Sequence, residues 1–471
     1  MVSIMVGNRR KTARNISRAS AAPRMRGLQP VADWRSKGTR EMKALTLLAA
    51  FVCSMTGISL PLTAHAAAPE SPWSLLVSDA AAMLAVDHAL TQADVPTLAR
   101  MYQTSSDPVS HVLAAMALER IHFNLDKSSE DARLCERSLI DSKPEVAFFC
   151  AKFANGDLRL SQGASRADAE ELDMVRRFAG KLPKAQLEQM KNYVAGHATD
   201  PELQVRMPSQ SFSIPVHRSL AHGNLPSVEA ESHGKKTWLL VDTGSSTLTL
   251  DEDTARDLGV AMLDRTGKTG GFLSHDIPVR YGSLDKLKIG ELTLLNVPVT
   301  VTAGNHRLIG IDILRRLGEF SLGEKSITVG EGADNSGTCK EPMLVASNLW
   351  GTELRLITAL SIDGQLRTTL LDSGSSQYLA ADQRTLDELH NSPRSRMKIS
   401  DMGVHHHAAR VSRATADVDI SGQPFTVTFE IFKDASLPWH YILGSGALQY
   451  MDFYFNFHTQ HTCLVLHHDL H

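Results

Sequence analysis

The sequence predicts an α+β protein of several domains: a helical N-terminal domain followed by an all-β domain built from two related halves. Apolar residues recur at helical intervals of three and four between about residues 70 and 200. After residue 205, strand-like runs of alternating apolar and polar residues replace them. Within that β-rich part, two short motifs each occur twice and in the same order.

The N-terminal lead differs in charge from the rest of the chain. Residues 1–43 hold eleven Lys or Arg against two acidic residues, a balance of +9, and no charged residue follows until after Ala66. The whole chain has 49 basic and 52 acidic residues, so 38 basic and 50 acidic residues remain, a balance of −12. An acidic chain of this kind does not favour a nucleic-acid partner, and we expect none.

The apolar run that begins at Ala44 is typical of a secretory signal peptide. Lys43 precedes it, and Ala64-His65-Ala66 has the small-x-small pattern of a cleavage site. We therefore expect residues 42–66 to be a signal peptide that is removed on export to the periplasm or the medium.

Two points about the N-terminus stay open. Residues 1–41 are either an unusual basic lead or the product of a wrongly assigned start. Residues 44–66 could instead remain as a membrane anchor, because about 20 apolar residues can cross a bilayer.

Four cysteines follow the signal peptide: Cys135, Cys150, Cys339 and Cys463. In an oxidising compartment they are compatible with two disulfides, most simply Cys135–Cys150 and Cys339–Cys463, although the sequence leaves all three pairings open. Their spacings do not resemble a zinc site. We expect neither a metal nor another cofactor.

Residues 70–200 are expected to form several short helices. Ser105–Pro108, Lys143-Pro144 and Gly156 are candidate breaks between them. The pattern fits an array of helix pairs that docks a protein partner, or a small bundle packed against its neighbour. A propeptide that covers the site until it is removed is a third alternative.

The β-rich part repeats itself between residues 205–335 and 340–471. The first half contains Trp238-Leu-Leu-Val-Asp-Thr-Gly-Ser-Ser246 and later Leu308-Ile-Gly310. The second half contains Thr368-Thr-Leu-Leu-Asp-Ser-Gly-Ser-Ser376 and later Tyr441-Ile-Leu-Gly444. The same two motifs at nearly the same separation indicate a duplicated unit.

An apolar strand that ends in Asp and turns through Thr/Ser-Gly-Ser suits a catalytic carboxylate. The glycine permits a tight turn, and the hydroxyls and backbone donors orient the carboxylate. Two such carboxylates, Asp242 and Asp372, brought together cannot both ionise cheaply, so they would share one proton. The ionised member can then activate a water while the neutral member donates to a substrate carbonyl.

These paired motifs resemble the active-site loops of aspartic proteases, and their short form is nearer to retropepsin-like than to pepsin-like members. The resemblance covers about residues 205–470 and implies a bilobal domain with Asp242 and Asp372 as the catalytic pair. It also implies a set of residues that support the loops: Thr243, Gly244, Ser245, Ser373, Gly374, Ser375, Gly310 and Gly444.

The resemblance gives these supporting residues separate roles. The hydroxyls of Thr243 and Ser373 would lock one loop to the other, and those of Ser245 and Ser375 would donate to the outer carboxylate oxygens. Gly310 in the first half and Gly444 in the second would each allow another segment of the chain to pass close to the loop of its own half.

The family also has a mobile hairpin over its cleft. Gly270 and Gly271 follow the first aspartate at a suitable distance, and Gly403, beside the triplet His405–His407, follows the second. We expect these glycines to mark flaps.

The sequence thus predicts an exported aspartic endopeptidase that cleaves a peptide or protein substrate. Both motifs lie in one chain, so a monomer is sufficient. The alternative is a module with the protease fold that binds peptides and hydrolyses little.

Overall fold

The computed structural model describes residues 5–6, 72–195, 202–218, 224–271, 274, 276–334, 339–387, 395–400, 407–433, 435 and 437–467. The predicted signal peptide, the flap glycine Gly403 and all but two residues of the basic lead lie outside these ranges. No helix of the described residues is long and apolar enough to span a membrane.

Helices joined by short connections make up the described segment from Pro72 to Ala195. They are α1 (Pro72–Gln92), α2 (Val95–Thr104), α3 (Pro108–Ile121), α4 (Leu125–Leu139), α5 (Pro144–Gln162), α6 (Ala164–Arg177) and α7 (Lys184–Ala195). Each helix contacts the next one along the chain. Proline starts α3 and α5, and the Asp107 carboxylate accepts the backbone N–H of Ser110 over 2.8 Å at the start of α3.

One predicted helix break is wrong. Gly156 lies inside α5 rather than between two helices. A Cβ on this residue would lie 2.3 Å from the carbonyl oxygen of Leu349. Glycine is present here because another segment of backbone approaches the helix, and not because the helix ends.

The first β half forms a nine-stranded sheet, in which β4 pairs with β5 beside the order β2-β10-β7-β11-β6-β5-β9-β8. Its strands are β2 (Gln204–Arg206), β4 (His217–Arg218), β5 (Pro226–Ser232), β6 (Lys235–Val241), β7 (Thr249–Asp251), β8 (Ala261–Thr269), β9 (Ile277–Ile289), β10 (Leu292–Thr302) and β11 (Leu308–Ile309). Three short helical segments belong to this half: α8 (Glu252–Leu258), α9 (Ile311–Leu314) and η2 (Arg315–Leu317).

The second β half forms another nine-stranded sheet, in the order β1-β18-β19-β20-β17-β21-β16-β15-β14. Its strands are β1 (Met5–Val6), β14 (Leu344–Ser347), β15 (Leu354–Ile362), β16 (Gln365–Asp372), β17 (Leu379–Asp382), β18 (Ser395–Ser400), β19 (His407–Ile420), β20 (Gln423–Phe432) and β21 (Tyr441–Gly444). The single-turn helices η3 (Gln383–Asp387) and η4 (Ser445–Gln449) complete it.

The sequence repeat is also a repeat of strand topology. In the first sheet β11 lies between β6, to which it is parallel, and β7, to which it is antiparallel. In the second sheet β21 lies in the same way between β16 and β17. The outer neighbours agree too, since β10 runs parallel to β7 and β20 runs parallel to β17.

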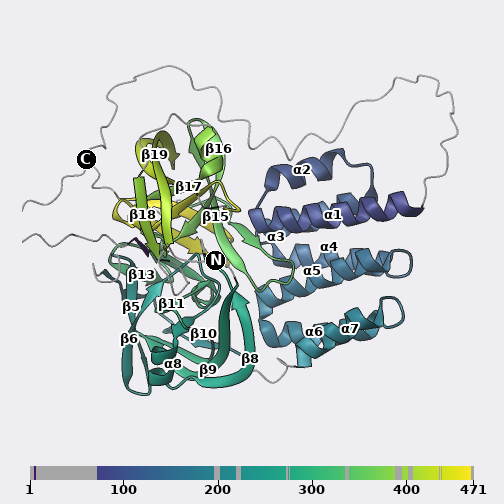
Figure 1. Cartoon of the computed structure of the whole chain (residues 1–471), viewed down its shortest axis with the longest axis horizontal. Helices are drawn as coiled ribbons and strands as arrows, with labels where there is room; N and C mark the ends of the chain where they lie inside the picture. The colour runs from purple at the N-terminus through teal and green to yellow at the C-terminus, as the bar shows by residue number, and fades with distance from the viewer. Residues whose placement is uncertain are drawn as a thin grey trace, which may run out of the picture.

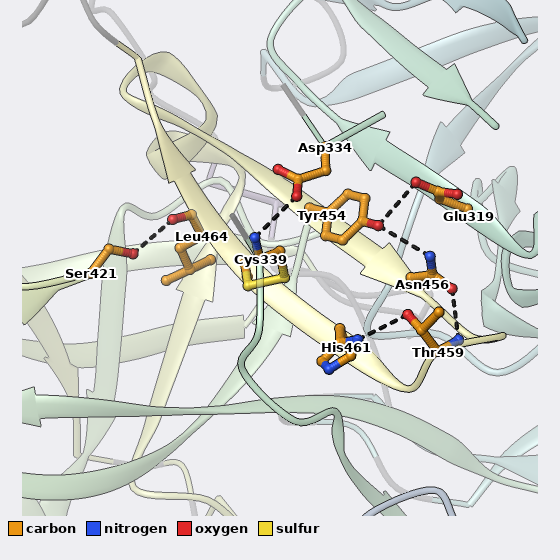
Figure 2. The surroundings of a disulfide bond; sticks show 10 residues. Glu319, Asp334, Cys339, Ser421, Tyr454, Asn456, Thr459, His461 and Leu464 are labelled. Carbon is orange, nitrogen blue, oxygen red and sulfur yellow. Dashed lines mark hydrogen bonds between the residues drawn. A yellow bond between two sulfur atoms is a disulfide. The ribbon is translucent and has the colours of Figure 1, made fainter. Parts of the chain in front are cut away.

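A five-stranded sheet joins the two halves. It contains β3 (Phe212–Pro215), β12 (Glu319–Leu322) and β13 (Ser326–Val329) from the first half, and β22 (Met451–Asn456) and β23 (His461–Leu466) from the second. Within this sheet the halves meet at the antiparallel pair β12–β22, and the Tyr454 hydroxyl on β22 donates to the Glu319 carboxylate on β12 over 3.0 Å (Figure 2).

The described residues contain two disulfides, in one of the three pairings that the sequence left open. Cys135 pairs with Cys150 between α4 and α5. Cys339 pairs with Cys463 and ties the segment between the halves to β23, close to Asp334, whose carboxylate accepts the Cys339 N–H over 3.0 Å (Figure 2).

The helices lie beside the β halves and share a hydrophobic core with the second of them (Figure 1). Leu113 and Phe153 from the helices belong to the same buried cluster as Ile357, Leu370 and Ile442 from the second sheet. The helical region is therefore continuous with the β-rich region through packed side chains.

One buried ion pair anchors this contact. Arg120 on α3 is fully buried, and its Nε donates to Asp157 on α5 over 2.6 Å. Its Nη1 donates to the carbonyl oxygens of Asn348 and Leu349, 3.2 and 3.1 Å away, in the segment that leads into β15. The guanidinium thus links two helices to the second β half.

Candidate active site

The two aspartates are held at the ends of corresponding strands. Asp242 directly follows β6, and Asp372 is the last residue of β16. The strand residues before each aspartate are buried, so the strands deliver the carboxylates into the interior. Asp242 is 0% exposed and Asp372 is 2% exposed.

The backbone of both turns is the same. Gly244 N–H donates to Asp242 Oδ1 over 2.9 Å, and Gly374 N–H donates to Asp372 Oδ1 over the same distance. Each turn is also closed by a backbone bond to the aspartate carbonyl oxygen, 3.2 Å from the nitrogen of Ser245 and 3.0 Å from that of Ser375. Each carboxylate is therefore oriented by its own turn.

The hydroxyl residues cross from one turn to the other. Thr243 Oγ1 donates to the Leu371 carbonyl oxygen over 2.7 Å and accepts the Ser373 N–H over 3.0 Å. Ser373 Oγ makes the mirror-image pair: it donates to the Val241 carbonyl oxygen over 2.7 Å and accepts the Thr243 N–H over 3.0 Å. These four buried hydrogen bonds fasten the two turns together, as the resemblance implied for these residues.

The two carboxylates lie in one site. A Cβ on Gly244 would lie 2.5 Å from the carboxyl carbon of Asp372, so the first turn touches the second aspartate. Asp372 and Asp242 also share a side-chain hydrogen bond. Burial, and after it the charge of Asp242, raises the pKa of Asp372 well above its usual value. The pair consequently retains one proton where isolated carboxylic acids would have lost theirs.

Gly310 and Gly444 lie directly against the turns. A Cβ on Gly310 would lie 2.5 Å from the backbone nitrogen of Thr247, and one on Gly444 would lie 2.4 Å from the carbonyl oxygen of Gln377. Neither glycine has a positive φ, so the requirement is for space and not for an unusual backbone conformation.

Two expected hydrogen bonds are not formed. Ser245 Oγ donates to the Thr247 carbonyl oxygen over 3.4 Å rather than to a carboxylate. Ser375 Oγ is buried and makes no hydrogen bond within the described structure. The role expected for these two hydroxyls is therefore wrong for this structure, in which the Gly244 and Gly374 N–H groups donate to the Oδ1 atoms of the two aspartates.

A model of the aspartyl protease family matches residues 228–314, which include the first aspartate turn and Gly310. Among solved structures, a retropepsin-like aspartic protease from Rickettsia conorii is 21% identical, with a TM-score of 0.21, and the similarity covers 26% of this chain and 94% of that chain. A search of curated proteins found no match.

The first pair of predicted flap glycines lies at a hairpin tip. Thr269, the last residue of β8, is opposite Ile277, the first residue of β9, and Gly270 and Gly271 follow directly after β8. The corresponding hairpin in the second half joins β18 to β19, and Gly403 falls between those strands, outside the described residues.

No cluster of three or more His, Cys, Asp or Glu side chains that could hold a metal ion occurs among the described residues. Of the histidine triplet only His407, the first residue of β19, lies within them.

One further residue of the site was not predicted from any motif in the sequence. Arg355, near the start of β15, is 4% exposed, and its Nη1 donates to Ser246 Oγ at the first turn. It interacts electrostatically with both Asp242 and Asp372. The available signal was a single charged residue inside the apolar run Leu354-Arg-Leu-Ile, where a burial cost would need a compensating partner.

Proposed function

We propose that the protein is an exported aspartic endopeptidase in which Asp242 and Asp372 activate a water for attack on a peptide bond. The observation that carries the proposal is the pair of reciprocal hydrogen bonds between Thr243 and Ser373, which brings two buried carboxylates into one site. A turn with only a structural role would not need to be hydrogen-bonded to an equivalent turn from the other half.

The shared proton assigns a role to each aspartate. Asp372, whose pKa is raised by burial and by its neighbour, is the member that keeps the proton and donates it to the substrate carbonyl oxygen. Asp242 is the ionised member and accepts a proton from the attacking water. The water oxygen forms the new C–O bond, the C–N bond of the peptide then breaks, and the proton that Asp242 took from the water passes to the leaving amine. No covalent enzyme intermediate forms, and neither a metal nor a cofactor takes part in this mechanism.

The two β halves are proposed as the two lobes of the protease. Their matching strand topology and the five-stranded sheet between them support this division. Because each lobe supplies one aspartate, a single chain can form the complete site, and no dimer is required for catalysis. The substrate is a peptide or protein.

Export remains a proposal, based on the apolar segment at residues 42–66. Two disulfides are compatible with an oxidising compartment such as the periplasm or the medium. For the helical domain we favour a permanent part of the fold over a removable propeptide, because its residues share a core with the second β half. Its remaining surface is available to a protein partner.

A peptide-library digest tests the activity. The purified protein is incubated with a random peptide mixture at several values between about pH 3 and about pH 8, and products are identified by mass spectrometry. We expect cleavage at a preferred sequence, and none with the matched control variant Asp242→Asn. Peptide binding without cleavage at every pH would instead support the peptide-binding module, and equal cleavage by the control would contradict the proposed site.

A further inference from the structure

Arg355 is a buried arginine that the proposed reaction does not use. Burying a guanidinium is costly unless other groups compensate for the lost hydration. Its Nη1 donates to Ser246 Oγ and to the Leu354 carbonyl oxygen, the latter over 2.8 Å. Ser246 belongs to the turn that carries Asp242, whereas Arg355 belongs to the second β half. The side chain thus bridges the two halves at the site.

The strand register brings Arg355 close to the second aspartate. β15 lies antiparallel to β16, and Ile357 is opposite Leu370. Arg355 and Asp372 each lie two residues beyond this pair, toward the same end of the two strands. Since side chains alternate along a strand, both residues project from the same face as that pair. The guanidinium therefore reaches the first turn from a position beside the second.

We propose that Arg355 is a positioning residue of this site: it ties β15 to the first aspartate turn, and its charge sets the pH range over which the two aspartates share one proton. The inference rests on the proposed function for its meaning in catalysis. The titration of the aspartate pair can be measured without a substrate.

The sign of the electrostatic effect follows from the charges that surround Arg355. Asp242, Asp372 and Glu353 interact with it, and α9, which contacts β15, carries Asp312. A positive charge stabilises the ionised carboxylates, so it lowers the pKa of the aspartate pair against the raising effect of burial. Removing the charge moves both titration steps of the pair, and any activity profile that depends on them, to higher pH.

Arg218 provides a matched control. It also bridges the halves, because its Nη2 donates to the Ser445 carbonyl oxygen over 2.9 Å. Burial lowers its pKa, and its electrostatic partner is Glu324 rather than either catalytic aspartate. Replacing Arg218 also removes a hydrogen bond between the halves, but it leaves the positive charge near the aspartate pair in place.

Carbon-13 NMR of labelled aspartate carboxyl groups measures the titration directly. Spectra of the whole protein are followed with pH for the wild type and for Arg355→Gln, Arg355→Lys and Arg218→Gln. Asp242→Asn and Asp372→Asn identify the resonances of the pair. We expect Arg355→Gln to raise both titration steps by about one pH unit, and Arg355→Lys and Arg218→Gln to leave them within about 0.3 unit of the wild type.

The proposal is overturned if Arg355→Gln titrates as the wild type does, or if Arg218→Gln shifts the pair as far. Circular dichroism identifies a variant that does not fold. If Arg355→Gln is such a variant, the lysine variant decides, because a one-unit shift despite a retained charge would contradict the electrostatic role. A wild type that titrates as expected but cleaves no peptide would disprove the proposed function and leave this inference standing.

Discussion

The two aspartate turns have the same backbone but different surroundings. Both are closed by the same glycine and serine N–H groups, and their crossing hydrogen bonds mirror each other to within 0.1 Å, at 2.7 and 3.0 Å. The strand beside Asp372 presents Arg355, whereas Leu225, which holds the corresponding position before β5, is buried and apolar. A duplicated backbone therefore gives the carboxylates equal geometry, and the neighbouring side chains make their chemistry unequal.

The segments that support the turns differ in the same way. The Asp312 N–H donates to the Ser246 carbonyl oxygen over 3.1 Å, and the Gly446 N–H donates to the Gln377 carbonyl oxygen over 3.1 Å. A similar backbone contact is thus made one residue further along the second turn, and the first half has the ionisable side chain of Asp312 where the second half has Gly446. Substitutions in the turns and beside them can show whether the symmetry belongs to the backbone and the asymmetry to the side chains.

Gly244→Ala should have the largest effect, because the added Cβ would lie 2.5 Å from the Asp372 carboxyl carbon and force the two turns apart. We expect kcat/KM for peptide cleavage to fall at least about 100-fold. Gly270→Ala is the control for folding, since its Cβ would have no neighbour closer than 3.7 Å. Full activity of Gly244→Ala would mean that the turns are not in contact.

Thr243→Val and Ser373→Ala test the symmetry of the crossing hydrogen bonds. Each removes one hydroxyl that both donates and accepts, and leaves a buried carbonyl and N–H of the other turn without it. We expect each variant to lose about 2–4 kcal/mol of unfolding free energy, measured by urea denaturation. A large loss in one variant and none in the other would break the symmetry that we infer.

Asp312→Asn should have the smallest effect. It tests the difference between the segments that support the two turns, because only the first half has an ionisable side chain at this position. Burial raises the pKa of Asp312 to about 7. The folded state then binds this proton more tightly than the unfolded state, so its stabilising contribution is complete below about pH 4 and is lost as the pH rises through about 7.

The measurement for Asp312 is urea denaturation at about pH 5 and about pH 8. Between these values the wild type should lose about 2–3 kcal/mol more unfolding free energy than Asp312→Asn does. An identical pH dependence in the two proteins would show that the Asp312 carboxyl group is not perturbed.

The order of secondary structure was largely predictable from the sequence. Helical periodicity located the helices, with Pro108 and Pro144 at the starts of two of them. The alternation of apolar and polar residues located the strands. The aspartate turns were predictable because a strand, an acid, a hydroxyl residue and a glycine recur in a fixed order. Such local signals can be recognised from the sequence alone because they depend only on residues a few positions apart in the chain.

The remaining features depend on contacts between distant segments. The sequence did not indicate that α5 would need Gly156 to admit the Leu349 carbonyl oxygen, 193 positions further along. Nor did it predict that Arg355 would reach Ser246, 109 positions away. The serine hydroxyls of the turns were misassigned because a resemblance transfers residue types more safely than it transfers side-chain rotamers.

The central claim is that Asp242 and Asp372 act as one catalytic unit with one shared proton. Its most direct test is kcat/KM for peptide cleavage by the wild type, Asp242→Asn, Asp372→Asn and the double variant. Groups that act as a unit are not additive, so we predict that the two single variants and the double variant will be equally slow, at least about 100-fold below the wild type. A double variant whose loss is the product of two independent single losses, or a single variant with near-normal turnover, would contradict the claim.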